Sequence, residues 1–141
     1  MAEEQNQEIA RRAYRAASEG FRSGDFSGLD EVIAPDVRDH DPDPGQGEGR
    51  EGLKAFFAEL ARAFPGLEVV VDDLIAEGDR VAARVRFRGT HSGDFQGIAA
   101  SGRPVEMRVV DVLRIRDGKI VERWGVGDQL GLMQQLGAVP A

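Results

Sequence analysis

The first half of the chain is patterned for helices. Apolar residues recur at i, i+4, i+7 and i+11, so a helix with one buried face is predicted over about residues 5–22. A short helix is predicted over 26–33 and ends before Pro35. A third helix begins near residue 50 and ends at Pro65-Gly66. The residues that mark the first helix are Ala10, Tyr14, Ala17 and Phe21.

The segment over 36–49 is rich in proline and glycine, which excludes a helix there. We expect a short edge strand over 37–41 that runs into a loop.

The second half is patterned for strands. Apolar and polar residues alternate with period two, which is typical of strands with one buried face. Asp117-Gly118 stands between two such runs and predicts a type I′ hairpin, because both central residues of that turn need positive φ. A glycine-rich loop is expected over 89–104. Strands are predicted over 67–76, 81–88, 105–116 and 120–126.

Helices followed by strands in one chain of 141 residues predict a single α+β domain over 1–141, with helices packed on one face of an antiparallel sheet. A tail over 128–136 is expected to be helical.

Composition and charge narrow the function. The chain has no cysteine, which excludes disulfides and thiolate chemistry, and its two histidines lack metal-ligand spacing, so we expect no metal and no cofactor. The net charge of -7 argues against nucleic acid as a partner. The N-terminus lacks the features of a secretory signal, and no apolar run approaches the roughly 20 residues that span a bilayer. A cytoplasmic protein without a membrane partner is expected.

A series of short motifs covers nearly the whole chain. In their order and spacing they resemble the SnoaL-like polyketide cyclases, within the nuclear-transport-factor-2-like and ketosteroid-isomerase-like superfamily. The motifs are Ile33-Ala34-Pro35-Asp36, Asp39-His40-Asp41-Pro42, Gly49-Arg50-Glu51-Gly52-Leu53, Phe64-Pro65, the run from Asp73 to Val81, Gly89-Thr90-His91-Ser92-Gly93, Asp117-Gly118-Lys119-Ile120, Trp124 with Asp128, and Gln135-Leu136-Gly137.

This resemblance implies three N-terminal helices packed on a strongly curved, mainly antiparallel sheet that encloses an apolar pocket. It also implies a homodimer. The same fold carries cyclases, isomerases, epoxide hydrolases and non-catalytic binders, so the reaction has to be argued from individual residues.

Asp128 is the first candidate for catalysis. In the cyclases that the chain resembles, an aspartate at this point is the acid/base of an intramolecular aldol closure. Because alternate residues of a strand share a face, Asp128 is expected to enter the pocket beside Trp124. The alternative is that Asp128 caps the tail helix, a position that favours aspartate.

The two histidines are further candidates. Alternation along 37–41 lets only one of His40 and Asp41 face the pocket, and the resemblance favours His40, whose imidazole could polarise a ligand oxygen. The alternative is an edge histidine bonded to the loop backbone. His91 either lines the pocket mouth or is a loop histidine in contact with solvent.

Asp111 stands in the middle of an apolar stripe, where a carboxylate is costly unless it is paired or faces a polar cavity. Either Asp111 faces such a cavity, or Val110 and Val112 mark the buried face and Asp111 lies outside.

Tyr14 lies on the inner stripe of the first helix. The ketosteroid isomerases use a helix-one tyrosine to donate to the oxyanion, and simple core packing is the alternative. Large side chains on the inward faces of different elements are expected to line the pocket. They are Tyr14, Phe57, Phe64, Phe87, Met107 and Trp124.

Arginines alternate along two of the predicted strands. We interpret them as an outer sheet face paired with carboxylates and available to a dimer partner, rather than as an anion site. They are Arg84, Arg86, Arg88, Arg108, Arg114 and Arg116.

The favoured function is a cofactor-independent cyclase or isomerase that binds a small hydrophobic carbonyl compound. Asp128 would be its acid/base, with His40 and Tyr14 polarising oxygen.

One alternative is a non-catalytic binder, which needs no ionisable groups in its cavity. Another is an epoxide hydrolase, which needs an arginine between two aspartates. Asp111, Arg84 or Arg108, and Asp128 could form that set only if all point inward.

Overall fold

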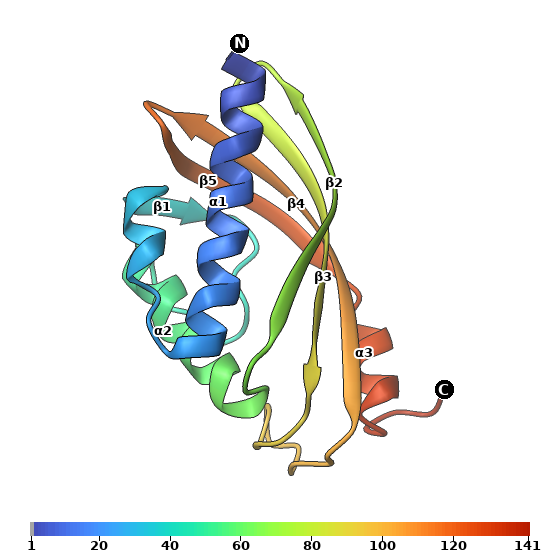
Figure 1. Ribbon diagram of the computed structural model, residues 1–141. Coiled ribbons are helices and arrows are strands. Elements are labelled where there is room, and N and C mark those ends of the chain that lie inside the picture. Colours follow the sequence, from blue (N-terminus) through green and yellow to red (C-terminus); the bar gives the residue numbers. More distant parts are fainter. Residues whose placement is uncertain (1) are drawn as a thin grey trace.

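The predicted elements form in the predicted order (Figure 1). The computed structural model describes residues 2–141. The helical elements are α1 (Ala2–Ser23), the 3-10 helix η1 (Ser27–Glu31), α2 (Gly49–Ala63) and α3 (Gln129–Gln135). The strands are β1 (Ile33–Asp39), β2 (Glu68–Glu77), β3 (Arg80–Thr90), β4 (Pro104–Arg116) and β5 (Lys119–Gly127).

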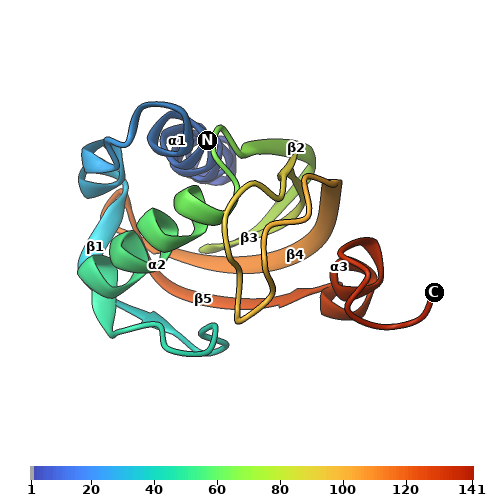
Figure 2. The same cartoon turned by 90° about the horizontal axis from the view of Figure 1, so that it is seen from below.

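The five strands form one open, mixed sheet in the order β1-β5-β4-β3-β2. Only β1 and β5 run parallel, and the other pairs are antiparallel. The sheet bends strongly, and α1 and α2 lie on its concave side (Figures 1 and 2). The expected α+β architecture with a curved, mainly antiparallel sheet is therefore confirmed.

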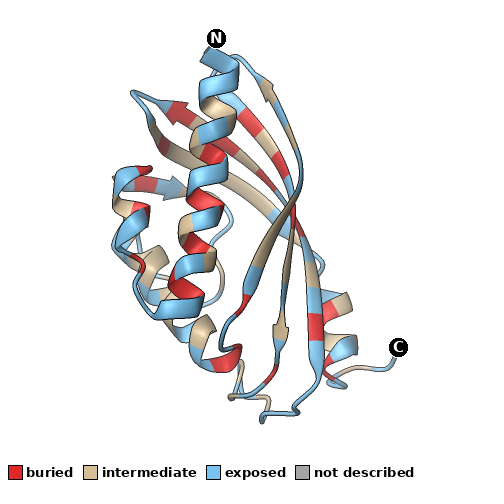
Figure 3. Ribbon diagram, in the orientation of Figure 1, coloured by how far each residue is buried: buried red, intermediate tan, exposed pale blue. Residues whose placement is uncertain are grey.

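Helix α1 buries its apolar face against the sheet (Figure 3). Its residues Ala10, Ala13, Tyr14, Ala17 and Phe21 are buried. The apolar face of α2 is only half-buried, because it borders a cavity instead of a filled core. Within residues 2–141, no helix has the length and apolar character needed to cross a membrane.

Individual residues of the sequence explain where several strands begin and end. Asp117 and Gly118 both have positive φ (52° and 76°), which confirms the expected I′ hairpin. The strand expected over 37–41 instead spans Ile33–Asp39, so the preceding helix is shorter than predicted. Pro35 is tolerated because β1 is an edge strand of the sheet.

A one-residue bulge in β5 decides which of its side chains face inward. Ile115 pairs with Ile120, but the next pair is Arg114 with Glu122, so Val121 is the extra residue. Without the bulge, Asp111 would lie opposite Trp124. With it, Asp111 lies opposite Gly125. A shift of one residue exchanges the two faces of a strand.

Candidate active site

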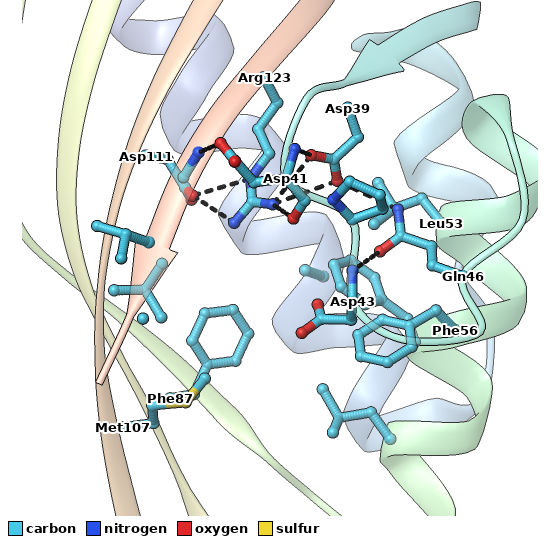
Figure 4. A pocket seen from close by; sticks show the side chains of 18 of the residues that line it. Asp39, Asp41, Asp43, Gln46, Leu53, Phe56, Phe87, Met107, Asp111 and Arg123 are labelled. Carbon is cyan, nitrogen blue, oxygen red and sulfur yellow. Dashed lines mark hydrogen bonds and ion pairs between the residues drawn. The ribbon is translucent and has the colours of Figure 1, made fainter. Parts of the chain in front are cut away.

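A cavity of about 590 Å³ lies between α2 and the concave face of the sheet. This volume suits a small organic ligand. Most of the lining is apolar and includes Phe56 and Leu60. One end is polar and contains Asp39, Asp41, Asp43, Gln46, Asp111 and Arg123 (Figure 4). Five of the predicted lining residues are confirmed: Tyr14, Phe57, Phe64, Phe87 and Met107.

Arg123 is at the centre of the polar end. Its Nη2 lies 2.9 Å from Asp111 Oδ1, and its Nη1 lies 3.1 Å from Asp39 Oδ1. Nη1 also donates to the backbone oxygen of Asp41. Burial by itself would lower the pKa of Arg123, but the charges and hydrogen bonds of Asp111 and Asp39 raise the pKa overall. The guanidinium is therefore a fixed positive charge in the pocket.

Asp111 faces the cavity and is only 6% exposed, whereas Val110 is 45% exposed on the outer face. Of the two interpretations of Asp111, the one in which its carboxylate faces a polar part of the cavity is therefore correct. Tyr14 Oη donates a 2.6 Å hydrogen bond to Asp111 Oδ2. Burial, followed by the charge of Asp111, raises the pKa of Tyr14 well above its ordinary value. The hydroxyl proton of Tyr14 is thus held by Asp111.

The loop after β1 is fixed by its own side chains. Gln46 Nε2 donates to Asp39 Oδ2, and Gln46 Oε1 accepts from the backbone N–H of Asp43. The backbone N–H of Gln46 also donates to the carbonyl of Asp43, which closes a turn. Pro44 and Gly45 (φ +83°) are the central residues, as a type II turn requires.

Asp41, and not His40, faces the pocket. Asp41 Oδ2 accepts from the backbone N–H of Gly125 at 2.9 Å. His40 lies on the outer face, where its Nε2 is 2.7 Å from Glu122 Oε2 and its ring stacks on Trp124 at 4.6 Å. The expectation that His40 faces this pocket is therefore wrong, because the alternation of side chains along β1 continues past Asp39 and turns Asp39 and Asp41 inward.

Asp43 presents its carboxylate to the cavity (Figure 4). The side chain is half-buried, and no donor within residues 2–141 bonds to it. Burial raises the pKa of Asp43. The charge of Arg123 opposes this rise, and those of Asp39 and Asp111 add to it.

Trp124 does not line the cavity. The guanidinium carbons of Arg80 and Arg114 lie 5.5 and 5.6 Å from its ring centroid, on the outer face. The expectation for Trp124 was wrong because the bulge at Val121 moves Arg123 and Gly125 inward and Trp124 outward.

Asp128 shares the outer face with Trp124, so the expectation that it enters the pocket is also wrong. Its Oδ1 accepts from the backbone N–H of Gly131, which caps α3. Its Oδ2 lies 3.5 Å from an Arg108 nitrogen. The cap interpretation is the one that the geometry supports.

His91 is fully buried and outside the cavity lining. Its Nδ1 accepts from the backbone N–H of Ser101 and lies 2.9 Å from Ser101 Oγ, while Phe64 packs against the ring. His91 therefore fastens the base of the 91–103 loop, which matches neither the pocket-mouth nor the solvent-contact interpretation.

Five of the six alternating arginines form ion pairs with carboxylates, as expected, and Arg116 is exposed without such a pair within residues 2–141. Arg86 pairs with Asp72 and Glu106, and Arg114 pairs with Glu122. Arg84 and Arg108 therefore cannot complete an inward Asp–Arg–Asp set with Asp111 and Asp128. The same arrangement is formed inside the pocket by different residues: Asp39, Arg123 and Asp111.

The sequence interpretation missed Arg123, Asp39, Asp43 and Gln46. Asp39 could have been found by alternation from Val37, which is buried. Arg123 depends on a bulge that leaves no clear mark in the sequence. Asp43 and Gln46 lie in a loop, where periodicity gives no direction. No group of three or more histidine, aspartate or glutamate side chains within residues 2–141 is arranged to hold a metal ion.

Comparison with known proteins places this chain in a family. The sequence profile of the SnoaL-like polyketide cyclases matches residues 11–136. The aklanonic acid methyl ester cyclase DauD of Streptomyces sp. (strain C5) is 32% identical over 111 residues, which cover 77% of this chain and 66% of DauD. DnrD of Streptomyces peucetius, also an aklanonic acid methyl ester cyclase, is 31% identical over 109 residues, which cover 76% of this chain and 72% of DnrD. This chain thus spans about two thirds of the length of DauD.

Two solved structures agree with this assignment. TsrD from Streptomyces laurentii superposes with a TM-score of 0.82 at 34% identity, covering 93% of this chain and 96% of TsrD. IdmH from Streptomyces antibioticus superposes with a TM-score of 0.79 at 38% identity, covering 94% of this chain and 99% of IdmH. The chain belongs to the SnoaL-like polyketide cyclase family.

Proposed function

We propose that this protein is a cofactor-independent cyclase or isomerase that moves protons at a carbon next to a carbonyl group of a small hydrophobic molecule. The observation that carries this proposal is the convergence of ionisable side chains at one end of an apolar cavity. Burying such groups is costly, and a simple binder of an apolar ligand does not need them. The relatives DauD and DnrD, both named as cyclases of a methyl ester, support a carbonyl-containing substrate.

Arg123 is the group that would hold the carbonyl oxygen. Of the five N–H groups of a guanidinium, three donate hydrogen bonds to Asp111, Asp39 and the backbone oxygen of Asp41. The two Nη2–H groups, whose nitrogen forms an ion pair with Asp111, donate no hydrogen bond within residues 2–141 and can serve a ligand. A fixed positive charge beside this oxygen stabilises the enolate that forms when the adjacent carbon loses a proton.

We propose a positioning role for Tyr14 in place of the expected direct contact with the carbonyl oxygen. Since its hydroxyl proton is held by Asp111, it acts through Asp111 and positions Arg123. The apolar part of the substrate would lie against Phe56, Phe87 and Met107.

Deuterium exchange of an aromatic β-keto ester tests this function. Ethyl benzoylacetate is incubated with the protein in mildly acidic D₂O, where uncatalysed exchange is slow, and deuterium at the carbon between the carbonyls is followed by NMR. We expect a 1:1 complex by native mass spectrometry and exchange about 10²-fold or more above buffer carboxylate at equal concentration. A complex without accelerated exchange would indicate a non-catalytic binder.

Epoxide hydrolysis is the second candidate, and the Asp39–Arg123–Asp111 arrangement is the observation that favours it. Against it, both carboxylates accept several hydrogen bonds, which makes them weak bases toward water. Incubation with styrene oxide in H₂¹⁸O distinguishes the reactions. Release of a diol with one ¹⁸O would support hydrolysis, and unchanged epoxide beside an exchanged β-keto ester would support the cyclase proposal.

We also propose that the protein is a homodimer that pairs through the outer sheet face. Large apolar side chains are exposed on this side of the molecule at Ile75, Val110 and Val126. Light scattering at micromolar concentration is expected to give twice the monomer mass, and Val110→Asp is expected to shift it toward the monomer. A monomeric wild-type protein would contradict this proposal.

A further inference from the structure

We infer that Asp43 is the catalytic residue that takes the proton from the substrate carbon and returns it to the product. This inference rests on the proposed function and adds the group that carries the proton.

Hydrogen bonding distinguishes Asp43 from the other carboxylates of the pocket. Asp111 accepts from Tyr14 and Arg123, Asp39 accepts from Arg123 and Gln46, and Asp41 accepts from the backbone N–H of Gly125. Each hydrogen bond that a carboxylate accepts stabilises its charged form and makes it a weaker base. Within residues 2–141, the Asp43 carboxylate is the one at this end of the cavity that receives no donor.

The position of Asp43 also suits a base that acts on a bound molecule. The Asp43 side chain points into the open part of the cavity on the side of Phe56 (Figure 4), so it can reach the body of a bound molecule. Its backbone is held at both the N–H and the carbonyl by Gln46. Pro42 and Pro44 restrict the chain on either side. An aligned base on a fixed backbone is what efficient proton transfer requires.

The charges around Asp43 favour its protonated form. Four carboxylates face one guanidinium at this end of the cavity: Asp39, Asp41, Asp43 and Asp111 against Arg123. The excess of negative charge, together with burial, favours a proton on the carboxylate that lacks donors. The raised pKa of Asp43 has the same causes.

The proton transfer balances without a co-reactant. The Asp43 carboxylate takes a proton from the carbon between two carbonyls, and the C–H electron pair becomes an enolate whose oxygen lies at Arg123. The enolate carbon attacks a second carbonyl of the same molecule and forms a C–C bond. The alkoxide that results takes the proton from the Asp43 carboxyl group. The product is an isomer of the substrate, and Asp43 is again a carboxylate.

The Asp43→Asn variant tests this assignment, because it keeps the shape of the side chain and removes the base. Asp36→Asn is the matched control, since Asp36 is exposed on β1 and outside the cavity lining. The measurements are deuterium exchange of ethyl benzoylacetate between pH 4 and 8, and its dissociation constant by NMR titration. Thermal unfolding confirms that each variant folds.

We expect Asp43→Asn to lower the exchange rate about 10²-fold or more. Affinity for the β-keto ester should change by less than about threefold, because the group acts in the transition state. The rise of the rate with pH should disappear in Asp43→Asn and persist in Asp36→Asn.

Two negative outcomes separate the inference from the function on which it rests. If Asp43→Asn exchanges as fast as the wild-type protein, Asp43 is not the base and the proposed function stands. If the wild-type protein binds the β-keto ester without exchanging it, the proposed function and this inference both fall.

Discussion

Two polar clusters lie on opposite faces of the sheet, and each takes one residue or more from β4 and from β5. The inner cluster consists of Asp39, Arg123, Asp111 and Tyr14. The outer cluster consists of His40, Glu122, Arg114 and Trp124. Each cluster contains an arginine bonded to a carboxylate, and the side chains of Arg123 and Arg114 are similarly exposed, at 23% and 24%. Composition and arginine burial therefore do not distinguish the clusters.

The difference is what each cluster faces. The inner cluster borders an apolar cavity and includes a nearly buried carboxylate, Asp111, whereas Glu122 in the outer cluster is 22% exposed. A charge that faces a ligand site can act on a ligand, and the same pair on the convex face contributes mainly to surface electrostatics. The face on which a residue lies thus decides its function.

The largest expected effect separates the two arginines. Arg123→Met removes the counter-charge of Asp111 and Asp39, and we expect the free energy of unfolding to fall by about 3–5 kcal/mol. Arg114→Met removes a pair near the surface, and we expect a loss of about 1 kcal/mol or less. Urea unfolding followed by circular dichroism measures both variants. Equal losses would mean that the inner cluster is as well solvated as the outer one.

A smaller effect is expected for the hydroxyl of Tyr14. Tyr14→Phe leaves Asp111 without its O–H donor, and we expect a loss of about 1–3 kcal/mol in the free energy of unfolding. The comparison on the outer face is His40→Gln, for which we expect about 1 kcal/mol or less. The same urea titration applies. A larger loss in His40→Gln than in Tyr14→Phe would reverse the comparison.

Asp43→Asn is expected to leave the protein as stable as the wild type or more stable at neutral pH. The pKa of Asp43 is raised in the folded protein, so the folded state holds this proton more tightly than the unfolded chain does. As pH rises above about 4, Asp43 of the wild-type protein loses its proton, and the stability that came from holding this proton is lost with it. The asparagine of the variant does not titrate. The stability difference in favour of the variant should therefore grow with pH and level off above the folded pKa.

Melting temperatures of wild type and Asp43→Asn between pH 3.5 and 8 measure this difference. A variant that becomes less stable than the wild type as pH rises would show that the Asp43 carboxylate is stabilised by partners, and would argue against its role as a base.

The smallest effect concerns Glu122 in the outer cluster. The hydrogen bond from His40, followed by the charge of Arg114, lowers the pKa of Glu122. A carboxylate whose pKa is lower in the folded protein than in the unfolded chain stabilises the folded state at pH values above its unfolded pKa. This stability is lost as the pH falls through the pKa of the folded state. Glu122→Gln is therefore expected to be slightly less stable than wild type at pH 7, with the difference vanishing at acidic pH. A difference that grows on acidification would contradict this.

The apolar part of the site could be predicted from the sequence, and most of its polar end could not. Strands β3 and β4 pair without interruption from Arg80 to Thr90, so alternation placed Phe87 and Met107 correctly. Strands β4 and β5 contain the bulge at Val121, so the same argument applied to Trp124 and Asp128 gave the wrong face. A bulge depends on how strands fit together in three dimensions, and the local sequence specifies it weakly.

Contacts between residues far apart in the sequence, and the directions of loop side chains, are equally hard to predict. Tyr14 was placed on the inner face by helical periodicity, but its bond to Asp111 joins residues 97 positions apart. Asp43 lies in a turn, and hydrogen bonds between its backbone and Gln46 help to fix its direction. The motifs that resemble the cyclase family predicted the fold, and the identities of the polar residues in the pocket came from the structure.

NMR spectroscopy of two consecutive residues tests the central claim most directly, because Arg123 faces the cavity and Trp124 faces outward. Trp124 is the only tryptophan, so it gives a single indole N–H signal, and the Arg123 Nε–H can be assigned through an Arg123→Lys variant. Titration with ethyl benzoylacetate is expected to shift the Arg123 Nε–H and the Gly125 amide while leaving the Trp124 indole in place. A shifted Trp124 indole beside an unchanged Arg123 would place the ligand on the outer face and contradict the account.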